Sequence, residues 1–216
     1  MHNIRLLMPA LMLLLVVACG REAPAVTAVV LPRGWQTVDE ATFSLALPPE
    51  WEVLSAADGN VEGAMDELVR ENPGLAGLAE RARTSVSSGE LKIIAFDLHP
   101  DDMLPTFTPN LSVGLQALEQ PAALREVADA NERELRASGF GDVRRTTIKV
   151  GGEDAVRLDS SLALSGAGGE PLALAIAQVV MVREEQQYVV TFTTAAEQRE
   201  RMEPIFDQIM GTFRIK

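Results

Sequence analysis

The residue types with the greatest potential for chemistry gather in one short stretch, Asp97-Leu98-His99-Pro100-Asp101-Asp102. Three carboxylates and an imidazole at the end of a strand have the donor atoms to ligate a divalent metal ion. The alternative is a solvated acidic loop, because the chain carries 31 aspartates and glutamates. We favour the loop and expect no metal, since no second ligand cluster is visible and Pro100 restricts how the ligands can converge.

Other catalytic or binding patterns are missing from the sequence. There is no G-x-S-x-G, no H-E-x-x-H, no phosphate-binding loop and no dinucleotide fingerprint. The glycine-rich stretch at residues 166–169 predicts a hairpin turn rather than a phosphate-binding site. A glycosidase needs only two carboxylates placed by the fold, so sequence spacing leaves that chemistry open.

Cys19 is the only cysteine of the chain, and its position carries information. It follows Arg5 and an apolar run over residues 6–18, the layout of a secretory signal peptide. The run falls short of the roughly 20 residues that a membrane span needs. The stretch Val16-Val17-Ala18-Cys19 resembles the lipobox of bacterial lipoproteins, in which the cysteine thiol takes a diacylglyceryl group. The alternative is a signal peptide with an incidental cysteine, and we predict cleavage before Cys19 and its acylation, with palmitate among the chains.

The overall charge bears on how the protein would stay at a membrane. The formal net charge is −12, and residues 1–18 carry one arginine and no acid, so the remainder is more negative by one. Such a protein is a poor partner for nucleic acid or for an anionic lipid surface. Acyl chains on Cys19 would anchor it against this repulsion. Gly20, where aspartate would retain a lipoprotein in the inner membrane, favours the outer membrane of a diderm source, and otherwise the cell membrane.

The sequence predicts a signal peptide at 1–18, a lipidated cysteine and tether at 19–33, and one folded domain at 34–216. Strands are expected at 43–47, 51–54, 91–98, 111–118, 144–150, 155–164, 172–182 and 188–193. Helices are expected at 61–87 with a break at 72–74, at 122–138, and from a capping box at 194–197 to Gly211. Strands joined by short turns and interleaved with amphipathic helices indicate an α+β fold, an α/β/α sandwich whose mostly antiparallel sheet is flanked by helices. With no disulfide available, the core alone must stabilise this domain, which we expect to be monomeric.

Three segments of this layout resemble the PsbP-like family, which includes the extrinsic photosystem II subunit, a Ran-binding eukaryotic relative and many bacterial lipoproteins. The segments are the opening Thr42–Trp51 (TFSLALPPEW), the middle Thr108–Val113 (TPNLSV), and the closing pair Tyr188–Thr193 (YVVTFT) and Phe206–Ile215 (FDQIMGTFRI). We expect the aromatic residues of these segments to pack in the core rather than to form a site: Phe43, Trp51, Phe192 and Phe206.

The resemblance implies a non-enzymatic protein with no catalytic residues and no cofactor, since the family mostly comprises assembly factors and binding modules. We therefore expect an envelope lipoprotein that binds or assembles a protein or another envelope component. The alternatives are a small-ligand-binding lipoprotein associated with a transporter, and a hydrolase. A broad apolar surface patch would favour the first, a pocket of converging polar groups the second, and paired carboxylates in a cleft the third.

Overall fold

A computed structural model describes residues 31–58, 61–71, 73, 76–87, 89, 91–105, 107–165 and 171–216. Cys19, the predicted signal peptide, most of the predicted tether and the glycine-rich stretch at 166–169 lie outside these residues.

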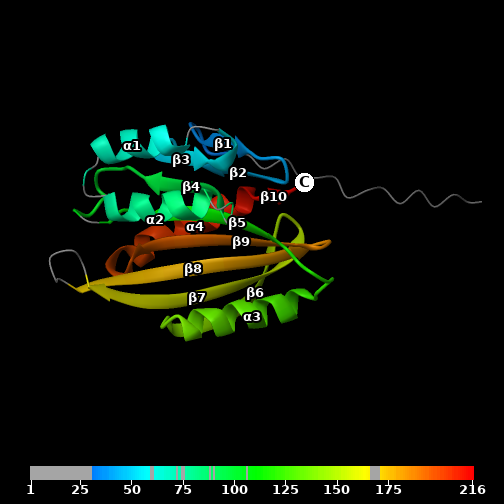
Figure 1. Ribbon diagram of the computed structural model, residues 1–216. Coiled ribbons are helices and arrows are strands. Elements are labelled where there is room, and N and C mark those ends of the chain that lie inside the picture. The colour runs from blue at the N-terminus through cyan, green and yellow to red at the C-terminus, as the bar shows by residue number, and fades with distance from the viewer. Residues whose placement is uncertain are drawn as a thin grey trace, which may run out of the picture.

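The centre of the fold is a seven-stranded antiparallel sheet in the order β3-β4-β5-β9-β8-β7-β6 (Figure 1). Its strands are β3 (Trp51–Ser55), β4 (Leu91–Asp97), β5 (Asn110–Ala117), β6 (Gly141–Val150), β7 (Glu153–Ser165), β8 (Pro171–Arg183) and β9 (Gln186–Ala195). The sequence analysis predicted each of them, with bounds that differ by a few residues. The hairpins β6–β7, β7–β8 and β8–β9 pair consecutive strands, so this half of the sheet is a meander.

A second sheet of three strands was not fully predicted. It has the order β1-β2-β10, with β2 (Phe43–Leu47) in the middle. The sequence analysis found β2 but neither β1 (Gln36–Asp39) nor β10 (Arg214–Ile215). These edge strands are too short to carry a clear alternation, and β10 forms only by pairing with Phe43 and Ser44. The small sheet thus joins the two ends of the folded chain.

Helices cover both faces of the large sheet. On one face, α4 (Arg199–Thr212) and the small sheet share a core with β3, β4, β5, β8 and β9. On the other face, α1 (Val61–Glu71) and α2 (Ala76–Ser87) pack over β3 and β4, and α3 (Leu124–Ala137) packs over β6, β7 and β8. In Figure 1, α3 accordingly lies at the opposite end of the sheet from α1. The predicted α/β/α sandwich with a mostly antiparallel sheet is confirmed.

The four predicted aromatic anchors are buried in the core. Phe43, Trp51, Phe192 and Phe206 are all at most 3% exposed. Phe192 stacks on Phe206 with ring centroids 5.0 Å apart, and Trp51 stacks on Phe192 at 6.2 Å. Stacked aromatic pairs of this kind add to the free energy of burial, so Trp51, Phe192 and Phe206 tie the large sheet to α4.

The start of the last helix differs from the prediction. Thr194 is still part of β9, where it pairs with Ala175, and a short 3₁₀ helix (η3, Ala196–Gln198) precedes α4. No side-chain capping bond is present at Ala195 or Gln198. The capping box predicted at 194–197 is therefore wrong, because sheet pairing holds Thr194 in an extended conformation.

Candidate functional site

The acidic stretch around His99 forms a structural junction between β4 and the last helix. Asp97 is 1% exposed, and its carboxylate accepts a hydrogen bond of 3.0 Å from the His99 backbone N–H. Asp102 is buried beside Arg201 of α4, with which it forms an ion pair. Gln198 adds a hydrogen bond of 2.9 Å to the Asp102 carbonyl. These contacts attach the loop to the segment that leads into α4.

One carboxyl group of this junction, that of Asp97, has a raised pKa. Burial raises the pKa of Asp97 to about 6, and the negative charge of Asp102 adds to this effect, while the hydrogen bond from His99 opposes it. His99 Nδ1 lies 3.7 Å from the Asp102 carboxylate. Within the described part of the chain, no group of three or more His, Cys, Asp and Glu side chains is placed to hold a metal ion.

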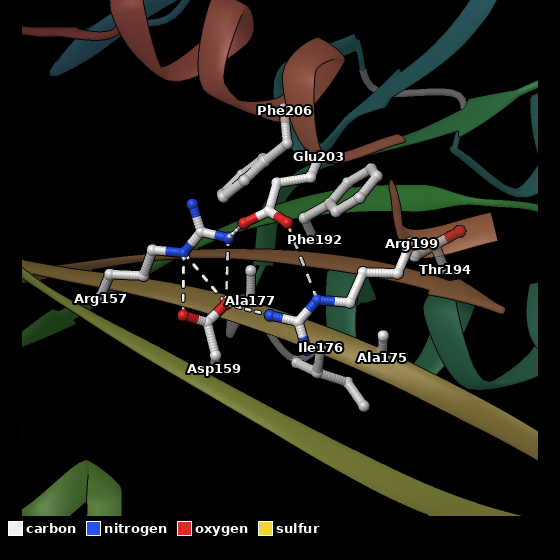
Figure 2. Close-up of a pocket in the computed structure, with 10 residues that line it drawn as sticks. All are labelled: Arg157, Asp159, Ala175, Ile176, Ala177, Phe192, Thr194, Arg199, Glu203 and Phe206. Atoms are coloured by element: carbon white, nitrogen blue, oxygen red, sulfur yellow. Dashed lines mark hydrogen bonds and ion pairs between the residues drawn. The ribbon is translucent and has the colours of Figure 1, made fainter. Parts of the chain in front are cut away.

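A network of charged side chains lies between β7 and α4 (Figure 2). Arg157, whose side chain is 13% exposed, forms ion pairs with Asp159 at 3.0 Å, Glu203 at 2.7 Å and Asp207 at 2.9 Å. Arg199 completes the network by contacting Asp159 at 3.3 Å. Burial disfavours the charge of Arg157, but the surrounding carboxylates outweigh it and raise its pKa above the ordinary value.

This network leaves little room for a ligand. The cavity that it lines with Phe192 and Phe206 holds about 10 Å³, close to the minimum for a single water molecule. Each charge within it faces a partner on the chain itself (Figure 2). The network therefore connects α4 to the sheet rather than forming a binding site.

A much larger open groove lies on the other face of the sheet, between α3 and strands β5, β8 and β9. We call it the polar groove. Its volume is about 620 Å³, within the range of about 300–1,000 Å³ that is typical of small-molecule sites. Its polar lining side chains are Gln116 of β5, Asn131 and Glu134 of α3, Ser138 at the C-cap of α3, Gln178 of β8 and Gln187 of β9. Its apolar walls include Leu135, Phe140 and Val189.

Hydrogen bonds between side chains shape the polar groove. Gln187 Nε2 donates to Asn131 Oδ1 at 3.2 Å, and Asn131 Nδ2 donates to the Val127 carbonyl at 2.8 Å. This chain of amides holds α3 against β9. Gln178 Nε2 donates to Thr191 Oγ1 at 3.4 Å, whereas Gln178 Oε1 is buried with no hydrogen-bond donor from the described residues. Gln178 Oε1 is therefore an unpaired acceptor buried beneath the lining of the groove, a state that costs about 1–3 kcal/mol.

The sequence analysis missed the polar groove. Its polar members come from four elements, and the main local signal was Gln178, an amide within the otherwise apolar run 171–182. A polar side chain on a buried strand needs a partner, so this residue could have been singled out. Neither Asp97 nor Asp102, which belong to the stretch that the sequence analysis weighed as a metal site and set aside, lines the groove.

Cys19 lies outside the described residues, so its acylation remains a prediction. Among the helices that the structure describes, none combines the length and apolar character needed to cross a membrane.

Comparisons with known proteins are informative at the level of structure. No protein-family model matches the sequence, and no curated protein matches it. Cyanobacterial PsbP (CyanoP) from Synechocystis sp. PCC 6803 is similar in structure, with a TM-score of 0.51 and 13% identity over 87% of this chain and 95% of that chain. LpqN of Mycobacterium tuberculosis, described as involved in cell envelope biogenesis, has a TM-score of 0.50 and 13% identity over 84% of this chain and 90% of that chain. The α+β sandwich is therefore the fold of PsbP, as the three sequence segments predicted.

Proposed function

We propose that the protein is a membrane-anchored, non-enzymatic binding module of the cell envelope, and that the polar groove is its binding site. The observation that carries the proposal is the groove itself, where side chains from α3 and three strands converge around about 620 Å³. This arrangement fits binding of a ligand or a protruding part of an envelope component.

The surface of the described residues supports a groove rather than a flat docking face. Among the described residues, the large hydrophobic side chains with the greatest exposure are Leu31, at 38%, and Leu164, at 37%. They belong to the start of the described chain and to β7 respectively. Protein-docking faces usually present contiguous apolar patches, and two isolated side chains do not form one.

The placement of the buried carboxylates supports a non-enzymatic function. Asp97 is held by its hydrogen bond to the backbone and Asp102 by Arg201. Neither lies in the polar groove, where a substrate would bind. Glu134 is the one carboxylate among the described residues that line the groove, and glycoside hydrolysis normally requires two.

The anchoring part of the proposal rests on the sequence. The apolar run ending at Cys19 supports export and acylation. The shared fold with LpqN, a protein involved in cell envelope biogenesis, is compatible with an envelope location. Residues 19–33 would then place the groove at a distance from the bilayer of roughly 20 Å, the mean reach of such a tether.

The test is photo-crosslinking in living cells of the source organism. The full-length protein would carry a benzophenone amino acid in place of Gln116, which is exposed on the rim of the groove. A matched protein would carry it in place of Gln208, which is exposed on α4 at the opposite face. We expect an envelope adduct from position 116 that is absent from position 208. Equal adducts at both positions, or none at 116, would refute the groove as the binding site.

A small-ligand-binding lipoprotein that serves a transporter is the second candidate, and the size of the groove favours it. This candidate predicts that the adduct at position 116 contains a small molecule, and that deleting the gene slows uptake of that molecule. An assembly module instead predicts an adduct with a protein or an envelope polymer and unchanged uptake.

A further inference from the structure

We propose that the polar groove binds a neutral, hydroxyl-rich saccharide. This inference rests on the proposed function and names the chemical class of the ligand.

The charge of the groove excludes most ionic ligands. Glu134 is the one charged side chain among the described residues that line it, and it is exposed at the edge on α3. No lysine or arginine of the described lining could pair with a phosphate or carboxylate, although such groups are normally bound by those side chains. The groove is also part of a protein with a net charge of −12, which repels anions further.

The hydrogen-bonding groups of the groove match a ligand that both donates and accepts. Gln116, Gln178 and Gln187 each carry an amide, which offers a carbonyl acceptor and two N–H donors. Ser138 adds a hydroxyl. Hydroxyl groups satisfy all of these partners, because each can donate one hydrogen bond and accept two.

The apolar walls match the other surface of a sugar ring. Phe140 and Val189 lie among the amides of the lining, so a ligand must present apolar C–H groups next to its hydroxyls. Saccharide rings have this alternation of polar edges and apolar faces. The volume of about 620 Å³ lies in the small-molecule range and admits an oligosaccharide of a few rings.

The floor of the groove disfavours an extended peptide. Val189 of β9 pairs with Gly114 of β5 on one side and with Val180 of β8 on the other. Gln178 of β8 is likewise paired on both sides, with Thr191 and Leu158. The main chain here has no free ladder positions for strand addition, the usual way in which sheets bind extended peptides. Only side chains can recognise the ligand.

The test uses calorimetric titration of the full-length protein, purified in a detergent without a sugar headgroup. The probes are neutral hexose and N-acetylhexosamine oligosaccharides of two to four rings, tetragalacturonate as an anionic homologue, and an uncharged tetrapeptide. We expect at least one neutral oligosaccharide to bind at least tenfold more tightly than the anionic homologue and the peptide. The Gln178→Leu variant, which keeps the size of the side chain but removes the amide, should weaken that binding at least tenfold. The Gln208→Leu variant should change it less than twofold.

The same oligosaccharide should also reduce the crosslink formed from position 116. If the crosslink forms but no neutral oligosaccharide binds or competes, the saccharide inference is wrong while the proposed function stands. If saccharide binding survives Gln178→Leu in a variant that melts like the wild type, the sugar binds elsewhere and the inference is also wrong. Preferential binding of the peptide would identify a peptide ligand instead.

Discussion

The guanidinium carbon of Arg157 lies 5.6 Å from the centroid of the Phe206 ring. The same arginine reaches Glu203 and Asp207 of α4 and Asp159 of β7. A cation over an aromatic face is attracted by the ring quadrupole, so Arg157 contacts α4 through both its charge and the Phe206 ring. The packing of α4 on the sheet is therefore stabilised by Arg157 in two ways, through its ion pairs and through its contact with the Phe206 ring.

Replacing Phe206 with alanine should destabilise the domain by about 3–5 kcal/mol, the usual cost of truncating a buried phenylalanine. Phe206 is 1% exposed and stacks on Phe192. Urea denaturation would measure the loss, with Gln208→Ala, an exposed change on the same helix, as the control. A loss below about 1 kcal/mol would mean that Phe206 contributes little to the core, contrary to its burial.

Replacing Arg157 with methionine should cost about 2 kcal/mol. Removing one partner of a fully buried ion pair costs about 3–5 kcal/mol, but Glu203 and Asp207 keep access to water, with side chains 41% and 59% exposed. Asp159, the most buried of the three carboxylates, keeps Arg199 as a partner at 3.3 Å, which also limits the loss.

The matched control for Arg157 is Lys149→Met. Lys149 and Asp154 form an ion pair of 2.7 Å with both side chains at least 66% exposed. Pairs of this kind contribute about 0–1 kcal/mol. Equal losses from the two methionine variants in chemical denaturation would show that the Arg157 network is no stronger than a surface pair.

Replacing Asp97 with asparagine should stabilise the protein at neutral pH. The pKa of Asp97 is raised to about 6 in the folded protein from an ordinary value of 3.8, so the folded state holds this proton more tightly. The stabilisation from protonation is complete below about pH 4 and is lost as the pH rises through about 6. Asparagine stays neutral and retains an oxygen to accept the hydrogen bond from His99.

The expected gain for Asp97→Asn is about 2 kcal/mol at pH 7.5. It should fall towards zero at pH 4, in urea unfolding midpoints compared with wild type at each pH. Asp101→Asn is the control, since Asp101 is exposed on the same loop. A gain that does not change between these two pH values would exclude titration of Asp97 as its cause.

Replacing Gly151 with alanine should cost more than the same change at Gly152. Both glycines form the turn between β6 and β7 with positive φ, +60° and +93°. A Cβ atom at Gly151 would lie 2.8 Å from the carbonyl oxygen of Phe213, whereas one at Gly152 would meet nothing within 4 Å. We expect about 1 kcal/mol for Gly152→Ala from its backbone conformation, and at least about 1 kcal/mol more for Gly151→Ala from the clash. Equal thermal shifts for the two variants would contradict close packing of this turn against the C-terminal segment.

Replacing Cys19 with serine should leave an unlipidated precursor with its signal peptide uncut, because acylation requires the thiol. Mass spectrometry of the membrane fraction would show an acylated N-terminal residue 19 in the wild type and none in the variant. A wild-type protein that begins at another residue, or that carries no acyl mass, would contradict the predicted anchor.

The features that depend on neighbours in the chain were predictable from sequence. The alternation of Phe43, Leu45 and Leu47 identified β2, and Pro121 with Gly139 correctly bounded the region of α3. These patterns are local because the periods of strands and helices span only a few residues. The same reasoning failed at Thr194, where pairing with Ala175 kept the chain in β9 beyond the expected start of a helix.

Only the tertiary structure decided which distant side chains meet. Gln116, Asn131 and Gln187 line one groove because β5 and β9 are adjacent in the sheet and α3 packs beside them. Arg157 meets Glu203 across 46 positions of sequence. Asp97 belongs to a stretch that looks solvated in sequence, yet the packing of β4 buries it and raises its pKa. Burial, pKa and the convergence of ligand-binding groups all depend on strand order and helix packing. Neither can be inferred from the spacing of residues along the sequence.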